Sequence, residues 1–250
     1  MIPSQSSHFT VISDVHNTHL SLALKKTDYL LICGDITNRG NKDNLKSFGK
    51  WLKNQPAKNI IMVLGNHERE GYINRSFIIK SFQSIPNLNI LNGLQIINGF
   101  QFFGQSFPFK PVNTKLLSIN PDKPLITLSH EPPYGIMDYG IYQRKIINDT
   151  FYHAGNKVVR KFIEEVQPQV HCFGHCHSSH GVCLFGKTLC VNSSLTDDEG
   201  QPFKKPICLM YKNKEFKLID KSKYIPFYSF LKQKKIDPFE FIISKNEYFN

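Results

Sequence analysis

Short apolar runs rich in β-branched residues recur along the first 180 residues of the chain. They occupy residues 9–13, 29–33, 60–64, 125–129 and 170–173. Continuous apolar runs of this length are typical of strands that are covered on both faces. The pattern therefore predicts five buried strands.

The intervening segments show helical spacing. Leu45, Phe48, Trp51 and Leu52 fall on one helical face, and a second apolar face runs from residue 158 to 166 before Pro168. Helices that alternate with buried strands indicate an α/β layered core. After residue 177 the runs become shorter, at 182–184, 189–191, 207–211 and 216–218, and we expect them to complete the same sheets as antiparallel strands.

The chain reads as one domain, residues 1–220, followed by an extension, residues 221–250. The extension is aromatic and basic, with too much apolar mass for a solvated coil. We expect it to pack on the domain. The alternative is a partner-binding or nucleic-acid-binding segment, in which aromatic rings stack on bases among lysines.

Composition adds limits on location and partners. The chain has 250 residues, 40% of them hydrophobic and 20% charged, which is ordinary for a globular protein. It contains neither an apolar run of membrane-spanning length nor a visible signal peptide. We therefore expect a soluble, cytoplasmic protein with no membrane partner, whose 6 cysteines stay reduced.

The formal net charge of +11 favours anionic partners. The lysines are scattered, so nucleic acid is a possible partner without a clear binding pattern. The oligomeric state stays open.

Metal-ligand residue types follow each of the five predicted strands. The carboxyl ends of strands in an α/β sheet are where ligand sites form, because the chain leaves the sheet there into loops. A single histidine in such a place is more often structural than functional. The full set is Asp14, His16, Asp35, Asn66, His130, His175 and His177.

These residues lie in ordered motifs. The motifs are Asp14-Val15-His16, Gly34-Asp35 with Gly40, Gly65-Asn66-His67-Glu68, the isolated His130, and Gly174-His175-Cys176-His177. Their order and spacing resemble the calcineurin-like metallophosphoesterases. The segments 129–135 and 104–108 resemble the branch of metallophosphoesterase-domain-containing (MPPED-type) proteins within that family.

The resemblance implies an α/β (α+β, four-layer) fold, a double β-sandwich flanked by helices, that holds two divalent metal ions. Asp14, His16 and His177 would hold the first metal. Asn66, His130 and His175 would hold the second, and Asp35 would bridge the two by offering one oxygen to each. Carboxylates, imidazoles and an amide suit Mn²⁺, Fe²⁺/Fe³⁺ or Zn²⁺, with Mn²⁺ favoured.

The implied chemistry is hydrolysis of a phosphoric ester, in which a hydroxide that bridges the metals attacks phosphorus. Asp35 and His67 are the catalytic candidates, and His67 would stabilise the phosphate or protonate the leaving oxygen. We expect a phosphodiesterase for small or cyclic-nucleotide-type diesters. The alternatives are a nuclease or RNA-processing enzyme, a phosphomonoesterase, and a catalytically silent scaffold.

Several further residues have open interpretations. Arg39 and Arg69 lie in loops beside ligand positions and are candidates for binding substrate phosphate. Tyr134, Asp138 and Tyr139 either line the substrate pocket or belong to a packed loop. Asn192 ends a predicted strand at the same rim.

Overall fold

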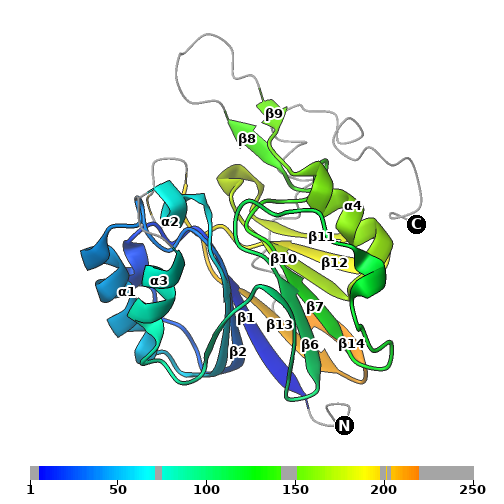
Figure 1. Cartoon of the computed structure of the whole chain (residues 1–250), viewed down its shortest axis with the longest axis horizontal. Coiled ribbons are helices and arrows are strands. Elements are labelled where there is room, and N and C mark those ends of the chain that lie inside the picture. The colour runs from blue at the N-terminus through cyan, green and yellow to red at the C-terminus, as the bar shows by residue number, and fades with distance from the viewer. Residues whose placement is uncertain (1–5, 71–74, 142–150, 198–200, 202–203, 220–250) are drawn as a thin grey trace.

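The computed structural model describes residues 6–70, 75–141, 151–197, 201 and 204–219. These residues form two mixed six-stranded sheets (Figure 1). In order across the first sheet, the strands are β14 (Glu215–Leu218), β13 (Ile207–Lys212), β1 (Ser7–Ile12), β2 (Thr27–Cys33), β3 (Ala57–Val63) and β4 (Leu88–Ile90). Across the second they are β11 (Gly181–Phe185), β12 (Thr188–Asn192), β10 (Val170–Phe173), β7 (Leu125–Leu128), β6 (Phe100–Gly104) and β5 (Gly93–Ile97).

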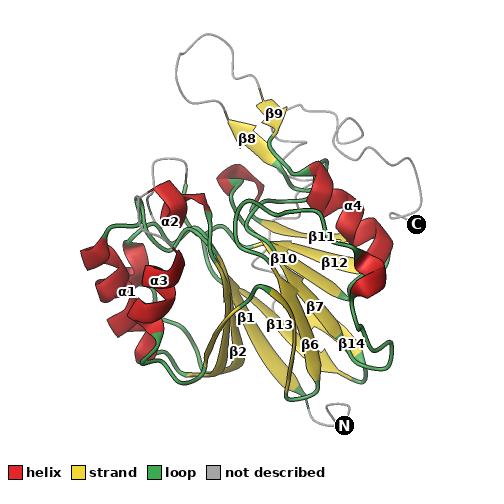
Figure 2. Ribbon diagram, viewed as in Figure 1, coloured by secondary structure: helices red, strands yellow, loops and turns green. Residues whose placement is uncertain are grey.

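Helices flank the two sheets, which gives four layers (Figure 2). The helices are α1 (Lys42–Lys53), α2 (Asn66–Glu70), α3 (Arg75–Phe82) and α4 (Lys157–Val166), with 3₁₀ turns η1 (Thr18–Ser21), η2 (Thr114–Leu116) and η3 (His177–Ser179). Helices α1 and α3 lie on the outer side of the first sheet, and α4 lies on that of the second. A small hairpin, β8 (Tyr139–Ile141) with β9 (Phe151–His153), completes the described elements.

The alternation of side chains along the strands explains the layers. On β2, Leu31 faces the second sheet and packs in one buried cluster with Phe102 of β6 and Leu128 of β7. Its neighbour Leu30 points the other way, into a second cluster that contains Phe48 of α1. Each sheet is thus apolar on both faces, as the continuous apolar runs predict.

Local sequence fixes both long helices. Asn41 caps α1, because its side-chain oxygen accepts a hydrogen bond from the backbone N–H of Asn44 at 2.8 Å. Asn156 caps α4 by accepting from Val158 N at 2.7 Å. Helix α4 ends at Val166, and its C-cap Gln167 is left-handed with a φ of 48° and precedes Pro168.

The predicted strands and helices are confirmed, with one correction and several omissions. Strand β12 was expected to be antiparallel, but it pairs with β10 in parallel and with β11 antiparallel. The sequence analysis did not predict α2, α3, β4, the β5–β6 hairpin or the β8–β9 hairpin. In β6, Gln101 interrupts the apolar run. Gln101 is fully buried, and its amide bonds to the backbone of Asn120 and Lys123.

The carboxyl ends of β1, β2 and β3 in one sheet lie beside those of β7 and β10 in the other. The loops that leave these five ends carry the candidate ligands. The extension 221–250 lies outside the described residues, so its packing and the boundary at residue 220 stay predictions. Within the described ranges, no helix is long and apolar enough to cross a membrane.

Candidate metal centre

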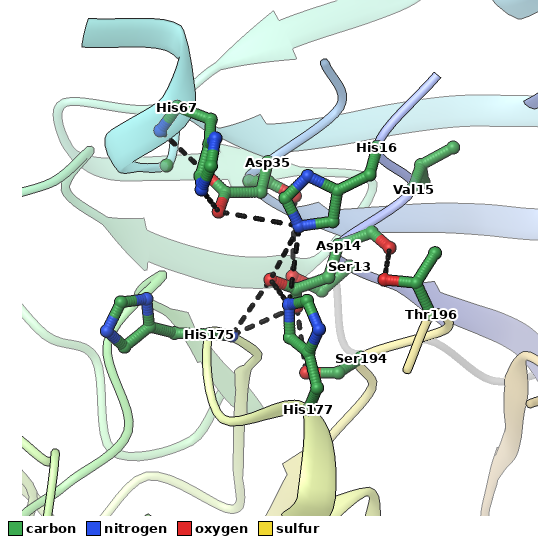
Figure 3. Close-up of polar contacts among 12 residues, drawn as sticks. Ser13, Asp14, Val15, His16, Asp35, His67, His175, His177, Ser194 and Thr196 are labelled. Atoms are coloured by element: carbon green, nitrogen blue, oxygen red, sulfur yellow. Dashed lines mark hydrogen bonds and ion pairs between the residues drawn. The ribbon is translucent and has the colours of Figure 1, made fainter. Parts of the chain in front are cut away.

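One group of donor atoms forms where β1 meets the loop after β10. Asp14 Oδ1 lies 3.3 Å from His177 Nε2 and 3.8 Å from His16 Nε2. The two imidazole nitrogens lie 3.3 Å apart. Figure 3 shows these three side chains pointing toward one another.

A second group forms between the loops after β3, β7 and β10. His130 Nε2 lies 2.9 Å from Asn66 Oδ1 and 3.2 Å from His175 Nδ1. Asn66 Oδ1 also lies 3.1 Å from His175 Nδ1. These atoms, with a carboxylate oxygen of Asp35, could hold one ion.

Asp35 lies between the two groups. Its Oδ2 is 3.2 Å from His130 Nε2 and 3.8 Å from His16 Nε2, so one oxygen faces both. Its Oδ1 instead accepts a hydrogen bond from His67 N at 3.0 Å. His67 Nε2 also approaches Asp35 Oδ2, at 3.8 Å, and this side chain is 32% exposed.

Three imidazoles are anchored through their outer nitrogen. Nδ1–H donates to a backbone carbonyl in each: His130 to Cys33 at 2.8 Å, His177 to Asp197 at 2.7 Å, and His67 to Asn38. Because a carbonyl can only accept, the neutral ring must carry its lone pair on Nε2, which faces the centre. Backbone anchoring of this kind orients metal-binding histidines.

Glycines allow the ligand loops to approach closely. A Cβ on Gly65 would lie 2.0 Å from Asp35 Oδ1, and one on Gly174 would lie 2.2 Å from Asp14 Oδ2. Gly34 has a φ of +95°, and a Cβ there would lie 2.8 Å from His130 Nδ1. These positions explain why a glycine precedes a ligand in three of the motifs.

Glu68 holds the backbone of Asp35 in place through a hydrogen bond. Its buried carboxylate accepts hydrogen bonds from Asp35 N and Gly65 N, both at 2.9 Å, and from Thr37 N at 3.1 Å. Burial and the charge of Asp35 raise the pKa of Glu68 to about 7. Sequence reasoning recorded Glu68 within a motif but gave it no role. Its contacts make it the residue that joins the loops after β2 and β3.

The carboxyl groups of Asp14 and Asp35 are ionised although both are buried, because their pKa values are lowered. Burial alone would raise the pKa of Asp14, but His177, His130 and His16 lower it well below its usual value. Burial lowers the pKa of His175 to about 4, with the neighbouring charge of His130 acting the same way. For His130, burial lowers the pKa, but Asp35 and Asp14 outweigh it and raise the pKa to about 10.

This donor set fits divalent cations. Two buried carboxylates, Asp14 at 0% and Asp35 at 1% exposed, need positive partners, since an unpaired buried charge is costly. The surrounding imidazoles and amide supply nitrogen and oxygen ligands of the types that Mn, Fe and Zn accept. The clusters therefore indicate a site for divalent metal ions.

Two supporting residues were missed by sequence reasoning. Ser194 Oγ donates to Asp14 Oδ2 at 2.8 Å, and Thr196 Oγ1 donates to Asp14 O at 2.9 Å (Figure 3). Both follow β12, whose parallel pairing with β10 brings its carboxyl end to the centre. The only sequence signal is the run of polar residues after the strand ends at Asn192.

The residues whose interpretation the sequence left open differ in burial and in their contacts. Asn192 and Asp138 are fully buried. Asn192 donates to the backbone of Met137 and Cys176, and Asp138 accepts from Gly135 N, Gly155 N and His153. Both fasten loops, as does Tyr139, whose N–H donates to Ser179 Oγ. Tyr134 is partly buried against His153, and Arg39 is exposed. The side chain of Arg69 lies outside the described part.

Comparisons with known proteins agree with this geometry. The family model described as calcineurin-like phosphoesterase matches residues 7–179. A UPF0046 protein of Caenorhabditis elegans is 28% identical over 218 residues, which cover 78% of this chain and 72% of that protein. Human metallophosphoesterase domain-containing protein 1 is 25% identical over 239 residues, 83% of this chain and 72% of that protein.

Solved structures support the fold. Purple acid phosphatase PPD1 from yellow lupin aligns with a TM-score of 0.54 at 10% identity, over 89% of this chain and 53% of that one. GAP50, the anchor in the inner membrane complex of Plasmodium, aligns with a TM-score of 0.53 at 11% identity, over 88% of this chain and 86% of that one. With the match over residues 7–179 and the ligand groups in place, this chain belongs to the calcineurin-like phosphoesterase family.

Proposed function

We propose that this protein is a binuclear, metal-dependent phosphodiesterase that hydrolyses small diesters, including cyclic-nucleotide-type diesters. The observation that carries the proposal is the position of Asp35 Oδ2, which faces His16 on one side and His130 on the other. A shared carboxylate between two donor groups suits a pair of ions about 3.5–4 Å apart. Mn²⁺ is the favoured metal, with Fe²⁺/Fe³⁺ or Zn²⁺ as alternatives.

When bound, such a metal pair supplies Lewis acidity for the phosphoryl oxygens and lowers the pKa of a water nucleophile. Asp14, His16 and His177 would hold one ion. Asn66, His130 and His175 would hold the other. The buried negative charges of Asp14 and Asp35 would attract both cations, and the backbone hydrogen bonds of His130 and His177 hold those two rings in orientation.

His67 is the candidate for proton transfer to the leaving oxygen. Its Nδ1–H is engaged by Asn38 O, so Nε2 faces the centre. At 32% exposed, the side chain can reach both the centre and a substrate from solution. A histidine in this position can protonate a leaving alkoxide or stabilise charge on the phosphate.

The choice of a diester rests on the motifs shared with MPPED-type proteins. The nuclease alternative depended on residues 221–250, which lie outside the described part, and no described contact favours it.

The six free cysteines, four of them buried, agree with a reducing compartment, so we propose the cytoplasm as the location.

The test compares bis-p-nitrophenyl phosphate with p-nitrophenyl phosphate after chelation and after Mn²⁺ is added back. We expect metal-dependent release that favours the diester. Preference for the monoester would move the assignment to a phosphatase. Absence of activity at full metal content would favour a silent scaffold.

Variants make this test specific. Asp35→Asn should abolish turnover, whereas Asp28→Asn, the same change at the other end of β2, should not. His67→Ala should keep the metals and lose rate mainly with poor leaving groups. Loss of metal from His67→Ala would reassign that residue as a ligand.

A further inference from the structure

A cavity of about 460 Å³ adjoins the second donor group. It lies between α2, α3 and the segment that follows β6, and its lining includes Gly65, Arg75, Gln105, Phe107 and Lys110. Gly65 directly precedes Asn66, and the Phe107 ring meets the His130 ring edge-on at 6.3 Å. The volume lies within the range of small-molecule sites. The cavity therefore borders the place where one substituent of a bound phosphoester would lie.

The lining is cationic. Arg75 and Lys110 both contribute to it, and Glu68 is the single acid among the described lining residues. The carboxylate of Glu68 accepts hydrogen bonds from Asp35, Gly65 and Thr37, and no ion pair among the described residues joins it to Arg75 or Lys110. With two cations against one acid, the described lining keeps a net positive charge. The two cations thus create a positive potential inside a partly enclosed space, where charges attract more strongly than in open water.

The geometry of Arg75 favours an anion. One terminal nitrogen, Nη2, donates to Leu91 O at 3.0 Å, which holds the half-buried side chain in place. A guanidinium carries five N–H donors, and N–H groups other than this one make no hydrogen bond to the described residues, so they can bind a ligand. An arginine that is already positioned loses little entropy on binding and recognises carboxylate or phosphate with two parallel hydrogen bonds.

We propose that this cavity, here called the Arg75 pocket, binds a second anionic group, a phosphate or carboxylate, on the substituent that stays attached to the hydrolysed phosphorus. The preferred substrate is then a diester that carries an additional negative charge. This inference rests on the proposed phosphodiesterase function. It deepens that function, because neither the donor groups nor the family match says which substituents the site accepts.

Two competing interpretations are distinguishable. In the first, Arg75 only stabilises the loop at Leu91 and takes no part in binding. In the second, the cavity holds a neutral planar group that stacks on Phe107 and bonds to the amide of Gln105. Neither predicts a preference for an added charge.

The experiment uses a matched pair of chromogenic diesters with the full chain and Mn²⁺: thymidine 5′-(p-nitrophenyl phosphate) with and without a 3′-phosphate. Hydrolysis of bis-p-nitrophenyl phosphate serves as the baseline, because it lacks the second anion. We expect the wild-type kcat/KM to be about tenfold or more higher for the 3′-phosphorylated substrate, the size typical of one charged hydrogen bond.

Variants locate the effect. Arg75→Gln and Lys110→Gln should each reduce that preference, measured as the ratio of kcat/KM for the substrates with and without the 3′-phosphate. Arg75→Lys should keep part of it. Lys58→Gln is the matched control, since Lys58 lies near the opposite end of β3 and pairs with Asp28. Lys110 is exposed, so its variant is informative even if Arg75→Gln unfolds.

A binding measurement separates this inference from the proposed function. Calorimetry should show that wild type binds thymidine 3′,5′-bisphosphate more tightly than thymidine 5′-phosphate, and that this difference is smaller in Arg75→Gln. If diesters are hydrolysed but the 3′-phosphate gives no advantage in rate or binding, the Arg75 pocket is refuted and the phosphodiesterase stands. If no diester is hydrolysed but the binding difference holds and depends on Arg75, the function fails and the anion site stands.

Discussion

The contact between Ser194 and Asp14 gives a quantitative test of how the centre is built. Ser194 is fully buried, and its Oγ lies 2.8 Å from Asp14 Oδ2. Ser194→Ala removes this donor and leaves the buried carboxylate with fewer partners. The variant should therefore weaken metal binding at the group that contains His16 and His177, without removing any ligand.

The expected size follows from the charge on the acceptor. A hydrogen bond to a charged group contributes roughly 1.5–3 kcal/mol. Since about 1.4 kcal/mol corresponds to a factor of ten, Kd for one ion should rise about 10- to 100-fold. Loss of hydrogen bonds to ligand carboxylates typically has effects of about this size in other metal sites.

Ser193→Ala is the matched control. Ser193 is also fully buried and adjacent, but its Oγ donates to the backbone carbonyl of Phe173 at 3.1 Å. Titration calorimetry of chelator-treated proteins with Mn²⁺ should show weaker binding of one ion in Ser194→Ala and near-normal binding in Ser193→Ala. An equal loss in both variants would mean that packing, and not the hydrogen bond to Asp14, determines affinity, and would refute the reasoning.

Three further predictions follow from the same geometry. Gly65→Ala places a Cβ 2.0 Å from Asp35 Oδ1. The variant should lower the free energy of unfolding, measured with urea, by about 1–3 kcal/mol and should abolish metal binding. The pKa of His130 is raised to about 10, so metal must displace a proton there at pH 7.5, and calorimetry in buffers of different ionisation enthalpy should detect its release. Burial lowers the pKa of His171 to about 3, below the unfolded value of about 6.5, so its contribution to stability is present above about pH 6.5 and is lost as pH falls toward 3. The free energy of unfolding, measured with urea, should therefore fall as pH is lowered from about 6.5 toward 3, and His171→Gln should make this pH dependence weaker.

The sequence predicted the strands that carry ligands because each is a local feature. A buried strand needs only a short apolar run, and the ligand type comes directly after it, as with Cys33 before Gly34 and Asp35. Convergence of those ends then follows from parallel pairing. This is why all seven candidate ligands could be placed at one edge before their contacts were known.

What sequence reasoning missed depends on pairing between distant segments. Ser194 reaches Asp14 only because β12 runs parallel to β10, and a short run such as residues 189–191 does not specify the direction of pairing. Gln101 interrupts the apolar run of β6, and its partners, the backbone groups of Asn120 and Lys123, lie in a loop some 20 residues away. In both cases the decisive partner is distant in sequence.

The ligands themselves hold unusual backbone conformations, and this connects the residue types to the geometry. Asp14, His16, Asp35 and His175 have φ values of 53°, 43°, 50° and 67°. Left-handed conformations are unfavourable for most residues with a side chain, but Asp, Asn and His tolerate them best. Asp and His are also metal ligands, so one residue can form the sharp turn after a strand and direct a ligand atom into the centre.

Hydrogen bonds across the loops, such as His16 N to Asp35 O at 3.1 Å and His175 N to Asp14 Oδ2 at 2.9 Å, hold these turns in place. The loops are thereby preorganised by the protein, which leaves the binding energy of the metals available for affinity.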